Sequence, residues 1–261
     1  MPAAASRPGK GNDGVIAALP MYDRPETRWA TDRFWGLIRT GLMARGIDAP
    51  ETLTRGNDPW EAWQAPDLVL AQTCGLPYRA RLHAQVTLIG SADFGLRGCP
   101  PGDYNSVILA RGDALPPAPV LAVNEALSQS GWAALERFCR DAGLSPRDIV
   151  LTGAHRASVR AVIAGRADMA ACDAQTWRLI QRHDDWARDA IEIARTPPGP
   201  GLPFITRAGQ DPAPYLAALS EACIALDAGD RAALNLCGIV ARAPGDYTAL
   251  PIPQAPDEAR G

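Results

Sequence analysis

The 261-residue sequence has few positive charges other than arginine. It contains one lysine, Lys10, no run of basic residues, and a net charge of −3. Proteins that bind nucleic acids carry a basic surface that neutralises phosphates, so no nucleic-acid partner is expected. No apolar run is long enough to span a bilayer, so membrane insertion is not expected either. The length and apolar content predict a globular protein with a substantial core.

Sequence motifs for nucleotides and metals are missing as well. No GxGxxG follows the first predicted strand, and no Walker A pattern occurs. The three histidines, His83, His155 and His183, do not form a metal-ligand cluster. We therefore expect no cofactor, no metal and no catalytic residue, and we predict that the protein is not an enzyme.

The six cysteines are scattered without a CxxC pair, and several lie in apolar runs. This spacing predicts buried free thiols in a reducing compartment rather than disulfides or a zinc site. One enzymatic alternative stays open at Cys74, which stands at a predicted strand-to-helix turn where the pKa of a thiol can be depressed. A cysteine hydrolase would use Cys74 as nucleophile and His155 or His83 as base, although no triad pattern supports it.

Both ends of the chain have the composition of irregular segments. Residues 1–14 are rich in Pro, Ala and Gly, lack the apolar core of a signal peptide, and are expected to be a disordered N-terminal segment. Residues 251–261 are polar and are expected to be a frayed C-terminal tail. The sequence as written leaves open a cytosolic protein and a mature or mis-started form of an exported one.

Short apolar runs alternate with amphipathic stretches along the chain, and this alternation predicts an α/β fold with mostly parallel sheets flanked by helices. Glycines such as Gly46 and Gly143 follow the amphipathic stretches, as expected at helix C-termini. Strands are expected at residues 15–19, 52–54, 67–72, 86–90, 104–111, 120–124, 149–152, 168–172, 191–194, 204–206 and 238–241. Helices are expected at residues 26–44, 132–142, 156–164 and 214–226, with shorter ones beginning near 60, 77 and 173.

Two Pro/Gly-rich breaks, at residues 99–103 and 197–201, bracket a middle segment that alternates on its own. The simplest topology has two lobes, because the chain would cross to a second lobe and then return. Lobe 1 is predicted at 15–103 and 201–250, and lobe 2 at 104–200. Two crossings make a hinge, and a hinge between lobes makes a ligand cleft.

A hydroxyl-rich turn stands where the strand at 120–124 gives way to the helix at 132–142. Its residues include Ser128, Ser130 and Gly131. The N-terminus of a helix has unpaired N–H groups and the positive end of the helix dipole, which suits a small anion. The alternative is that one serine simply caps the helix.

Further polar residues follow other predicted strands. In open α/β sheets, ligands bind beyond the carboxyl ends of the strands, so these side chains are expected to converge on one cleft. Each also has an ordinary structural explanation: a helix cap for Asp173, a loop or cap for His155, and a half-buried core position for each tyrosine. The residues are Tyr22, Thr73, Tyr78, His155 and Asp173.

Three segments, SQSGW, GAHRAS and GRADMAACDAQTW, occur in this order and spacing. In this respect the chain resembles the substrate-binding proteins of phosphate, phosphite and phosphonate ABC transporters. The resemblance covers about residues 15–240. It implies a two-lobe, type II periplasmic-binding-protein fold with the ligand in the cleft between the lobes.

The resemblance also implies roles for the residues of the cleft. Ser128 and Ser130 match hydroxyl groups that hold phosphoryl oxygens, while Gln129 replaces a hydroxyl residue of the family. His155 matches a histidine that donates to a phosphoryl oxygen. Asp173 matches a carboxylate that meets the ammonium group of aminoalkyl phosphonates.

From the opposite lobe, Tyr78 fits an aromatic residue that hydrogen-bonds the oxyanion. Tyr22 is a weaker candidate for a ligand contact, and Thr73 is a further candidate at the end of its strand.

The predicted function is that of a solute-binding protein that captures a small phosphonate-type or phosphate-type oxyanion for an ABC transporter. A transporter permease is the expected partner, and the protein is expected to be a monomer. The resemblance implies a periplasmic location. The alternative is a cytosolic metabolite sensor or scavenger on the same fold, and the third hypothesis is the Cys74 hydrolase.

Overall fold

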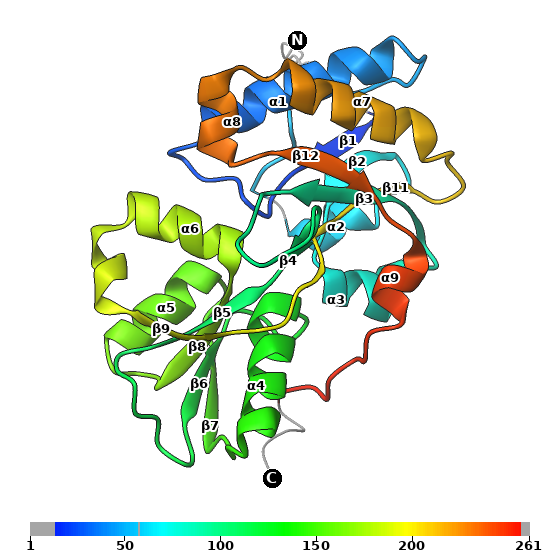
Figure 1. The fold of residues 1–261 in the computed structure, drawn as a ribbon. Helices are drawn as coiled ribbons and strands as arrows, with labels where there is room; N and C mark the ends of the chain where they lie inside the picture. The colour runs from blue at the N-terminus through cyan, green and yellow to red at the C-terminus, as the bar shows by residue number, and fades with distance from the viewer. Residues whose placement is uncertain (1–13, 57, 257–261) are drawn as a thin grey trace, which may run out of the picture.

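The computed structural model describes residues 14–56 and 58–256, which form two lobes, each built on a five-stranded sheet (Figure 1). The segment expected to be disordered lies outside the described residues except for Gly14, and so do residues 257–261 of the expected tail. No helix within the described ranges is long and apolar enough to cross a membrane.

The first sheet has the strand order β1-β2-β11-β3-β12. The helices α1, α7 and α8 cover it, and the α1–α7 contact is the most extensive of the helix–helix contacts in this lobe (Figure 1). These helices bury apolar side chains against the sheet, as Ile38 and Leu219 show. The strands are β1 (Ile16–Ala18), β2 (Leu68–Gln72), β3 (Val86–Asp93), β11 (Pro203–Arg207) and β12 (Gly238–Ala241), and the helices are α1 (Arg28–Met43), α7 (Ala213–Ala225) and α8 (Ala228–Leu234).

The second sheet has the strand order β7-β6-β8-β5-β9 and is covered on both faces. Alternate residues of one strand show this: Leu121 packs on the face that carries Leu135 of α4, and Ala122 on the face that carries Val162 of α5. The strands are β5 (Ser106–Ala110), β6 (Val120–Val123), β7 (Asp148–Leu151), β8 (Met169–Asp173) and β9 (Ile191–Arg195), and the helices are α4 (Ala134–Ala142), α5 (His155–Ile163) and α6 (Ala174–His183).

The prediction of mostly parallel sheets was wrong. Among the described strands of the two sheets, only β1/β2, β6/β7 and β6/β8 pair in parallel, whereas β5, β11 and β12 pair antiparallel with all their neighbours. The physical reason is the crossing of the chain. β5 and β11 each enter their sheet from the other lobe, so they run away from the cleft while β2, β6 and β8 run towards it.

The structure differs locally from the predicted elements. Residues 52–54 form no strand, although Thr54 N–H donates to Ala17 O at 2.7 Å. The strand expected at 104–111 is divided at Asn105, and its first part pairs outside the main sheet. The remaining short elements are α2 (Pro59–Trp63), α3 (Gly75–Pro77), α9 (Pro244–Thr248), the π-helical turns η1 (Tyr78–Leu82) and η2 (Gln129–Ala133), and the 3-10 turn η3 (Asp185–Asp189).

The two Pro/Gly-rich breaks lie side by side where the chain crosses between the lobes. They form an antiparallel ribbon of β4 (Asp103–Tyr104) and β10 (Gly199–Pro200). Gly201 N–H donates to Gly102 O at 2.9 Å, and a Cβ on Gly201 would lie 2.5 Å from the same oxygen. Only glycine therefore allows the two backbones to approach this closely.

Residues 251–256 are not frayed, in contrast to the prediction. The tail leaves α9 in the first lobe and runs beside α4 of the second (Figure 1). Two nitrogens of Arg79 donate to Pro251 O at 3.2 and 2.8 Å, and the indole Nε1 of Trp132 donates to Gln254 O at 2.6 Å. The tail is thus a third connection between the lobes, besides the two strands of the ribbon.

We expect Trp132→Phe to release this tail. The substitution keeps a buried aromatic ring but removes the donor to Gln254 O, which should cost about 1 kcal/mol. Limited proteolysis followed by mass spectrometry should show faster trimming from the C-terminus. Trp35→Phe is the matched control, because it removes an indole bond to Pro50 O at 3.2 Å without touching the tail. Equal trimming of the two variants would contradict the role given to Trp132.

Candidate functional site

A cavity of about 620 Å³ lies between the two lobes. On the first lobe it is lined by the loop after β1, by α2, and by the start of α3. On the second lobe it is lined by the segments that follow β6, β7 and β8. These are the carboxyl ends of parallel strands, the usual place for a ligand in α/β sheets.

Ser128 caps the helical segment that opens into the cavity. It has extended backbone angles at the N-cap of η2, and its Oγ accepts from Gly131 N–H at 2.9 Å. Serine is favoured here because its short side chain reaches the N–H groups of the first turn. The Ser128 O–H donates to no group among the described residues, so it is available to a ligand in the cavity.

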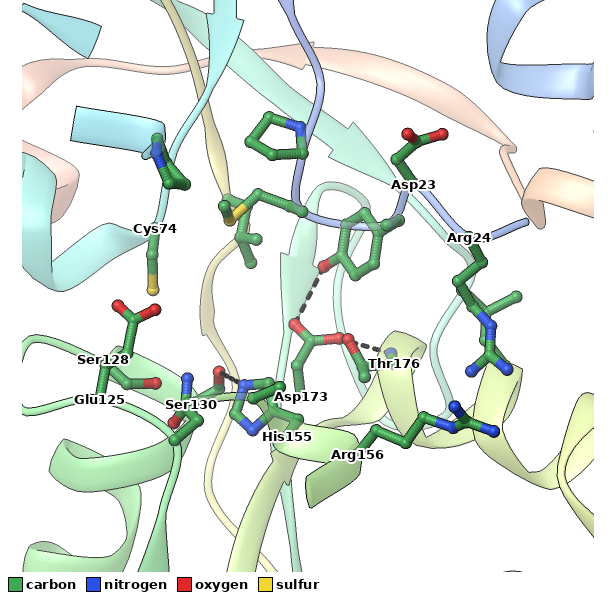
Figure 2. A pocket seen from close by; sticks show the side chains of 18 of the residues that line it. Asp23, Arg24, Cys74, Glu125, Ser128, Ser130, His155, Arg156, Asp173 and Thr176 are labelled. Atoms are coloured by element: carbon green, nitrogen blue, oxygen red, sulfur yellow. Dashed lines mark hydrogen bonds between the residues drawn. The ribbon is translucent and has the colours of Figure 1, made fainter. Parts of the chain in front are cut away.

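Ser130 and His155 form a hydrogen-bonded pair on the same side of the cavity (Figure 2). The distance from Ser130 Oγ to His155 Nε2 is 2.8 Å, and the other ring nitrogen, Nδ1, lies 3.2 Å from Ala171 O. Burial of the imidazole lowers the pKa of His155 to about 4, so the ring is neutral at physiological pH.

Asp173 is a buried carboxylate at the start of α6, and it connects the two lobes. Its Oδ1 accepts from Thr176 N–H at 2.8 Å, as an N-cap does, and its Oδ2 accepts from the Tyr22 hydroxyl at 3.0 Å. Burial raises the pKa of Asp173 to about 6. The pKa of Tyr22 is raised well above its ordinary value, mainly by burial and next by the charge of the Asp173 carboxylate. The tyrosine therefore stays protonated and acts as the donor.

An ion-pair cluster stands at one side of the cavity, where Arg24 of the first lobe and Arg156 of the second reach the same place (Figure 2). Arg24 Nη2 lies 2.9 Å from Asp184 Oδ2, and Arg156 Nε lies 2.9 Å from Asp184 Oδ1. Burial alone would raise the pKa of Asp184, but hydrogen bonds from Arg156 and Arg24 hold it below its ordinary value. No sequence pattern indicates this cluster, because its three residues are far apart in the chain and carry no motif.

The structure brings five of the eight predicted ligand residues to the cavity: Ser128, Ser130, His155, Asp173 and Tyr22. The other three do not line it, and each has a physical reason. Tyr78 is buried with its ring packed edge-on against Tyr247 at 5.1 Å between centroids. Thr73 is fully buried, and its N–H donates to Pro203 O. The side chain of Gln129 lies next to Gly75 across the lobe interface.

Cys74 lines the cavity, but its surroundings do not match the hydrolase hypothesis. Its Sγ accepts from Gln129 N–H of the other lobe at 3.4 Å. Burial raises the pKa of the Cys74 thiol, whereas a nucleophile would need a lowered one. The expected base, His155, bonds to Ser130 and to Ala171 O instead. The expectation of a depressed thiol pKa was therefore wrong, and neither the thiol nor His155 is arranged as a cysteine hydrolase would need.

The other cysteines are also free thiols, as expected. Cys139, Cys172 and Cys223 are buried, but Cys74 and Cys99 are only partly so and Cys237 is exposed, which corrects the expectation that all would be buried. Within the described residues, no group of three or more His, Cys, Asp or Glu side chains could hold a metal ion.

Two lobes joined by a short ribbon, with a cavity between them at the ends of parallel strands, define a periplasmic-binding-protein fold of type II. A family model described as "ABC transporter, phosphonate, periplasmic substrate-binding protein" matches residues 104–249. The chain belongs to this family, as its sequence motifs predicted. Members of the family bind small phosphonates, work with ABC transporter permeases, and are normally periplasmic.

Solved structures show the same fold. PhnD1 from Prochlorococcus marinus (MIT 9301), in complex with methylphosphonate, has a TM-score of 0.67 at 15% identity, covering 91% of this chain and 96% of PhnD1. The binding-protein component of an ABC phosphonate transporter from Pseudomonas aeruginosa has a TM-score of 0.63 at 14% identity, covering 90% and 83%.

A histidine kinase sensor domain with similarity to periplasmic binding proteins has a TM-score of 0.56 at 15% identity, covering 88% of this chain and 98% of that domain. No curated protein matches the sequence.

Proposed function

We propose that this protein binds a small phosphorus oxyanion, a phosphonate or a phosphate, and delivers it to an ABC transporter permease. The observation that carries the proposal is the first turn of η2. There Ser128 and Ser130 border a cavity between two lobes, in a chain that belongs to the phosphonate-binding family. A tetrahedral oxyanion needs several converging donors, and neutral donors at a helix end bind it without a fixed counter-charge. Release to a transporter then stays possible.

Because of its carboxylates, the cavity favours a ligand that also carries positive charge. Asp173, Glu125 and Asp58 all line it, while the guanidinium groups of Arg24 and Arg156 are paired with Asp184. A carboxylate near a bound anion repels a second negative charge but attracts an ammonium group. An aminoalkyl phosphonate, with a phosphonate at Ser128 and an amine towards Asp173, fits this arrangement.

In the proposed function, the lobes are the units 15–103 with 201–250, and 104–200, and they close over the ligand about the β4–β10 ribbon. The contacts that join them across the cavity support this division. They are the Tyr22–Asp173 hydrogen bond and the Arg24–Asp184 ion pair, which residues on opposite sides of the cavity supply. Hinge closure around a ligand is a common motion of two-lobe binding proteins.

A sensor on the same fold is the second candidate, and the similarity to the histidine kinase sensor domain favours it. Both candidates bind a ligand in the same cleft, so the cavity alone does not discriminate between them. The DNA around the coding region discriminates between the transport role and the sensor role. Neighbouring permease genes, or an in-frame upstream start that adds a signal peptide, support the transport role, while a neighbouring signalling gene supports the sensor.

A thermal-shift screen tests the proposed ligand class. The panel is phosphate, phosphite, methylphosphonate, 2-aminoethylphosphonate and sulfate, with calorimetry on each hit. A ligand at 100 times its Kd should raise the free energy of unfolding by about 2.7 kcal/mol. A selective shift with a phosphorus compound supports the proposal, and no shift with any of them overturns it.

Ser128→Ala should weaken binding of the best ligand by about 1–1.5 kcal/mol, because the O–H that remains free in the cavity is lost. It should also cost about 1 kcal/mol of stability through the missing cap. Calorimetry and urea unfolding measure the two effects separately. Asp227→Ala is the control: Asp227 caps α8 through Asp230 N–H at 2.7 Å and does not line the cavity, so only stability should change. Unchanged affinity in Ser128→Ala would refute the site assignment.

A further inference from the structure

The direction of the hydrogen bonds around His155 can be read from its two partners. Nδ1 lies 3.2 Å from Ala171 O, and a carbonyl oxygen only accepts, so Nδ1 carries a hydrogen. The imidazole is partly buried, and this burial lowers the pKa of His155 and keeps the ring neutral. A neutral imidazole has one N–H, so Nε2 is a bare acceptor.

This tautomer determines what Ser130 does. Ser130 Oγ lies 2.8 Å from the bare Nε2, so the serine must donate its only hydrogen to the histidine. The Ser130 side chain is buried and sits on the fixed backbone of η2, next to the cavity (Figure 2). What it offers to the cavity is a lone pair of Oγ.

We infer that Ser130, held by His155, is an acceptor that selects an oxyanion carrying a proton, such as a hydrogen phosphonate or hydrogen phosphate, over an oxyanion without one. The inference rests on the proposed function and specifies its ligand. It also reverses the role that the family resemblance implies for His155. The histidine does not donate to a phosphoryl oxygen but positions Ser130, and Ser130 touches the ligand.

A protonated oxyanion completes a chain of bonds that all run in one direction. The ligand P–OH donates to Ser130 Oγ, Ser130 O–H donates to His155 Nε2, and Nδ1–H donates to Ala171 O. A second ligand oxygen accepts from the Ser128 O–H. An oxyanion without a hydrogen would bring one of its lone pairs next to the lone pair of Ser130 Oγ. Two buried acceptors would then face each other without a donor, which weakens binding.

Other titratable groups share the cavity with this pair, and a pH profile of binding would include them. They come from both lobes: residues 22–26, Asp58 and Cys74 from the first, and Glu125, Arg156 and Asp173 from the second. Burial raises the pKa of Asp173 to about 6, so it titrates in the range where phosphonates do. A pair of ligands with equal charge at one pH avoids this overlap.

The test compares methylphosphonate with methanesulfonate by calorimetry, below the second ionisation of methylphosphonate. Both are then tetrahedral monoanions with one methyl group, and only the phosphonate carries an O–H. Hydrogen phosphate and sulfate, both dianions, form a second matched pair. We expect the sulfur compound of each pair to bind about 100-fold more weakly, since an unpaired buried acceptor costs this much.

Two variants test whether Ser130 and His155 produce the preference for the phosphorus compounds. Ser130→Ala removes the acceptor, and His155→Leu frees the Ser130 O–H to turn towards the ligand. In both variants the preference for the phosphorus compound over its sulfur partner should fall to less than about tenfold. In His155→Leu the cause should be tighter binding of the sulfonate, and a variant that had lost its structure would not show such a gain. Urea unfolding checks that each variant is folded.

The outcomes separate the inference from the proposed function. A phosphorus preference in the native protein that both variants lose supports the inference. Equal binding of the members of each pair, with phosphonate or phosphate still bound, overturns it and leaves the proposed function in place. Failure of every phosphorus oxyanion to bind overturns both.

Discussion

Replacing Asp173 by asparagine is expected to raise the free energy of unfolding by about 2–3 kcal/mol at neutral pH. Burial raises the pKa of Asp173 from 3.8 to about 6. Between these two values the folded protein binds more protons at this site than the unfolded chain does, so stability falls as pH rises through this window and stays low above it. One unit of pKa difference corresponds to about 1.36 kcal/mol, which gives the expected size.

Asparagine removes the charge but keeps the cap, because its side-chain oxygen can still accept from Thr176 N–H. Urea unfolding at about pH 4 and about pH 7.5 measures the effect, and the gain in stability should appear only at the higher pH. In the proposed function, Asp173→Asn should also weaken 2-aminoethylphosphonate more than methylphosphonate, because an ammonium group loses its carboxylate.

Asp227→Asn is the matched control for the pH window. Asp227 caps α8 at an exposed position, and its hydrogen bond from Asp230 N–H lowers its pKa, so its substitution should not stabilise the protein at neutral pH. A gain for Asp173→Asn that is equal at both pH values would contradict the assigned cause. A buried carboxylate that costs stability in a cavity is typical of a functional site.

Gly131→Ala is expected to have the largest steric effect in the site. A Cβ on Gly131 would lie 1.9 Å from Asn124 Oδ1 and 2.9 Å from Ser128 Oγ. Both neighbours line the cavity, so a methyl group must displace them or shift η2. We expect a loss of about 1–3 kcal/mol in stability, as for other overpacked sites, and at least about tenfold weaker ligand binding.

Gly36→Ala is the control for the loss of glycine. It lies exposed in α1 with no atom within 4 Å of the added Cβ, so alanine should stabilise the helix by about 0.5–1 kcal/mol. Urea unfolding and calorimetry of the two variants give the comparison. If Gly131→Ala binds ligand as the native protein does, the tight contact with Asn124 has no functional meaning.

Much of the candidate site could be predicted because its residues act locally. Ser128 and Asp173 cap helices through N–H groups three residues away, and short side chains with oxygen acceptors are favoured there for that reason. The order of the motifs indicated a known family, and the family model confirms that the chain belongs to it. The alternation of strands and helices predicted the α/β class, and the two Pro/Gly-rich breaks predicted the two lobes.

The direction of the strands and the partners of single side chains depended on the whole chain. A strand reads as the same apolar run in either direction, so the antiparallel pairing of β5 and β11 follows only from where the chain enters each sheet. Tyr78 follows a strand, as a ligand residue would, but its ring packs against Tyr247 from the far end of the chain.

The sequence by itself determined the fold class, the family and the two helix caps, since these depend on periodicity and on bonds between near neighbours. Only the tertiary structure decided the Arg24–Asp184–Arg156 cluster, the tail bound to Trp132, and the hydrogen bond between Ser130 and His155. The reason is that a hydrogen bond between distant residues requires two backbones to be held a few ångströms apart. That distance is set by the packing of both lobes and not by the residues that form the bond.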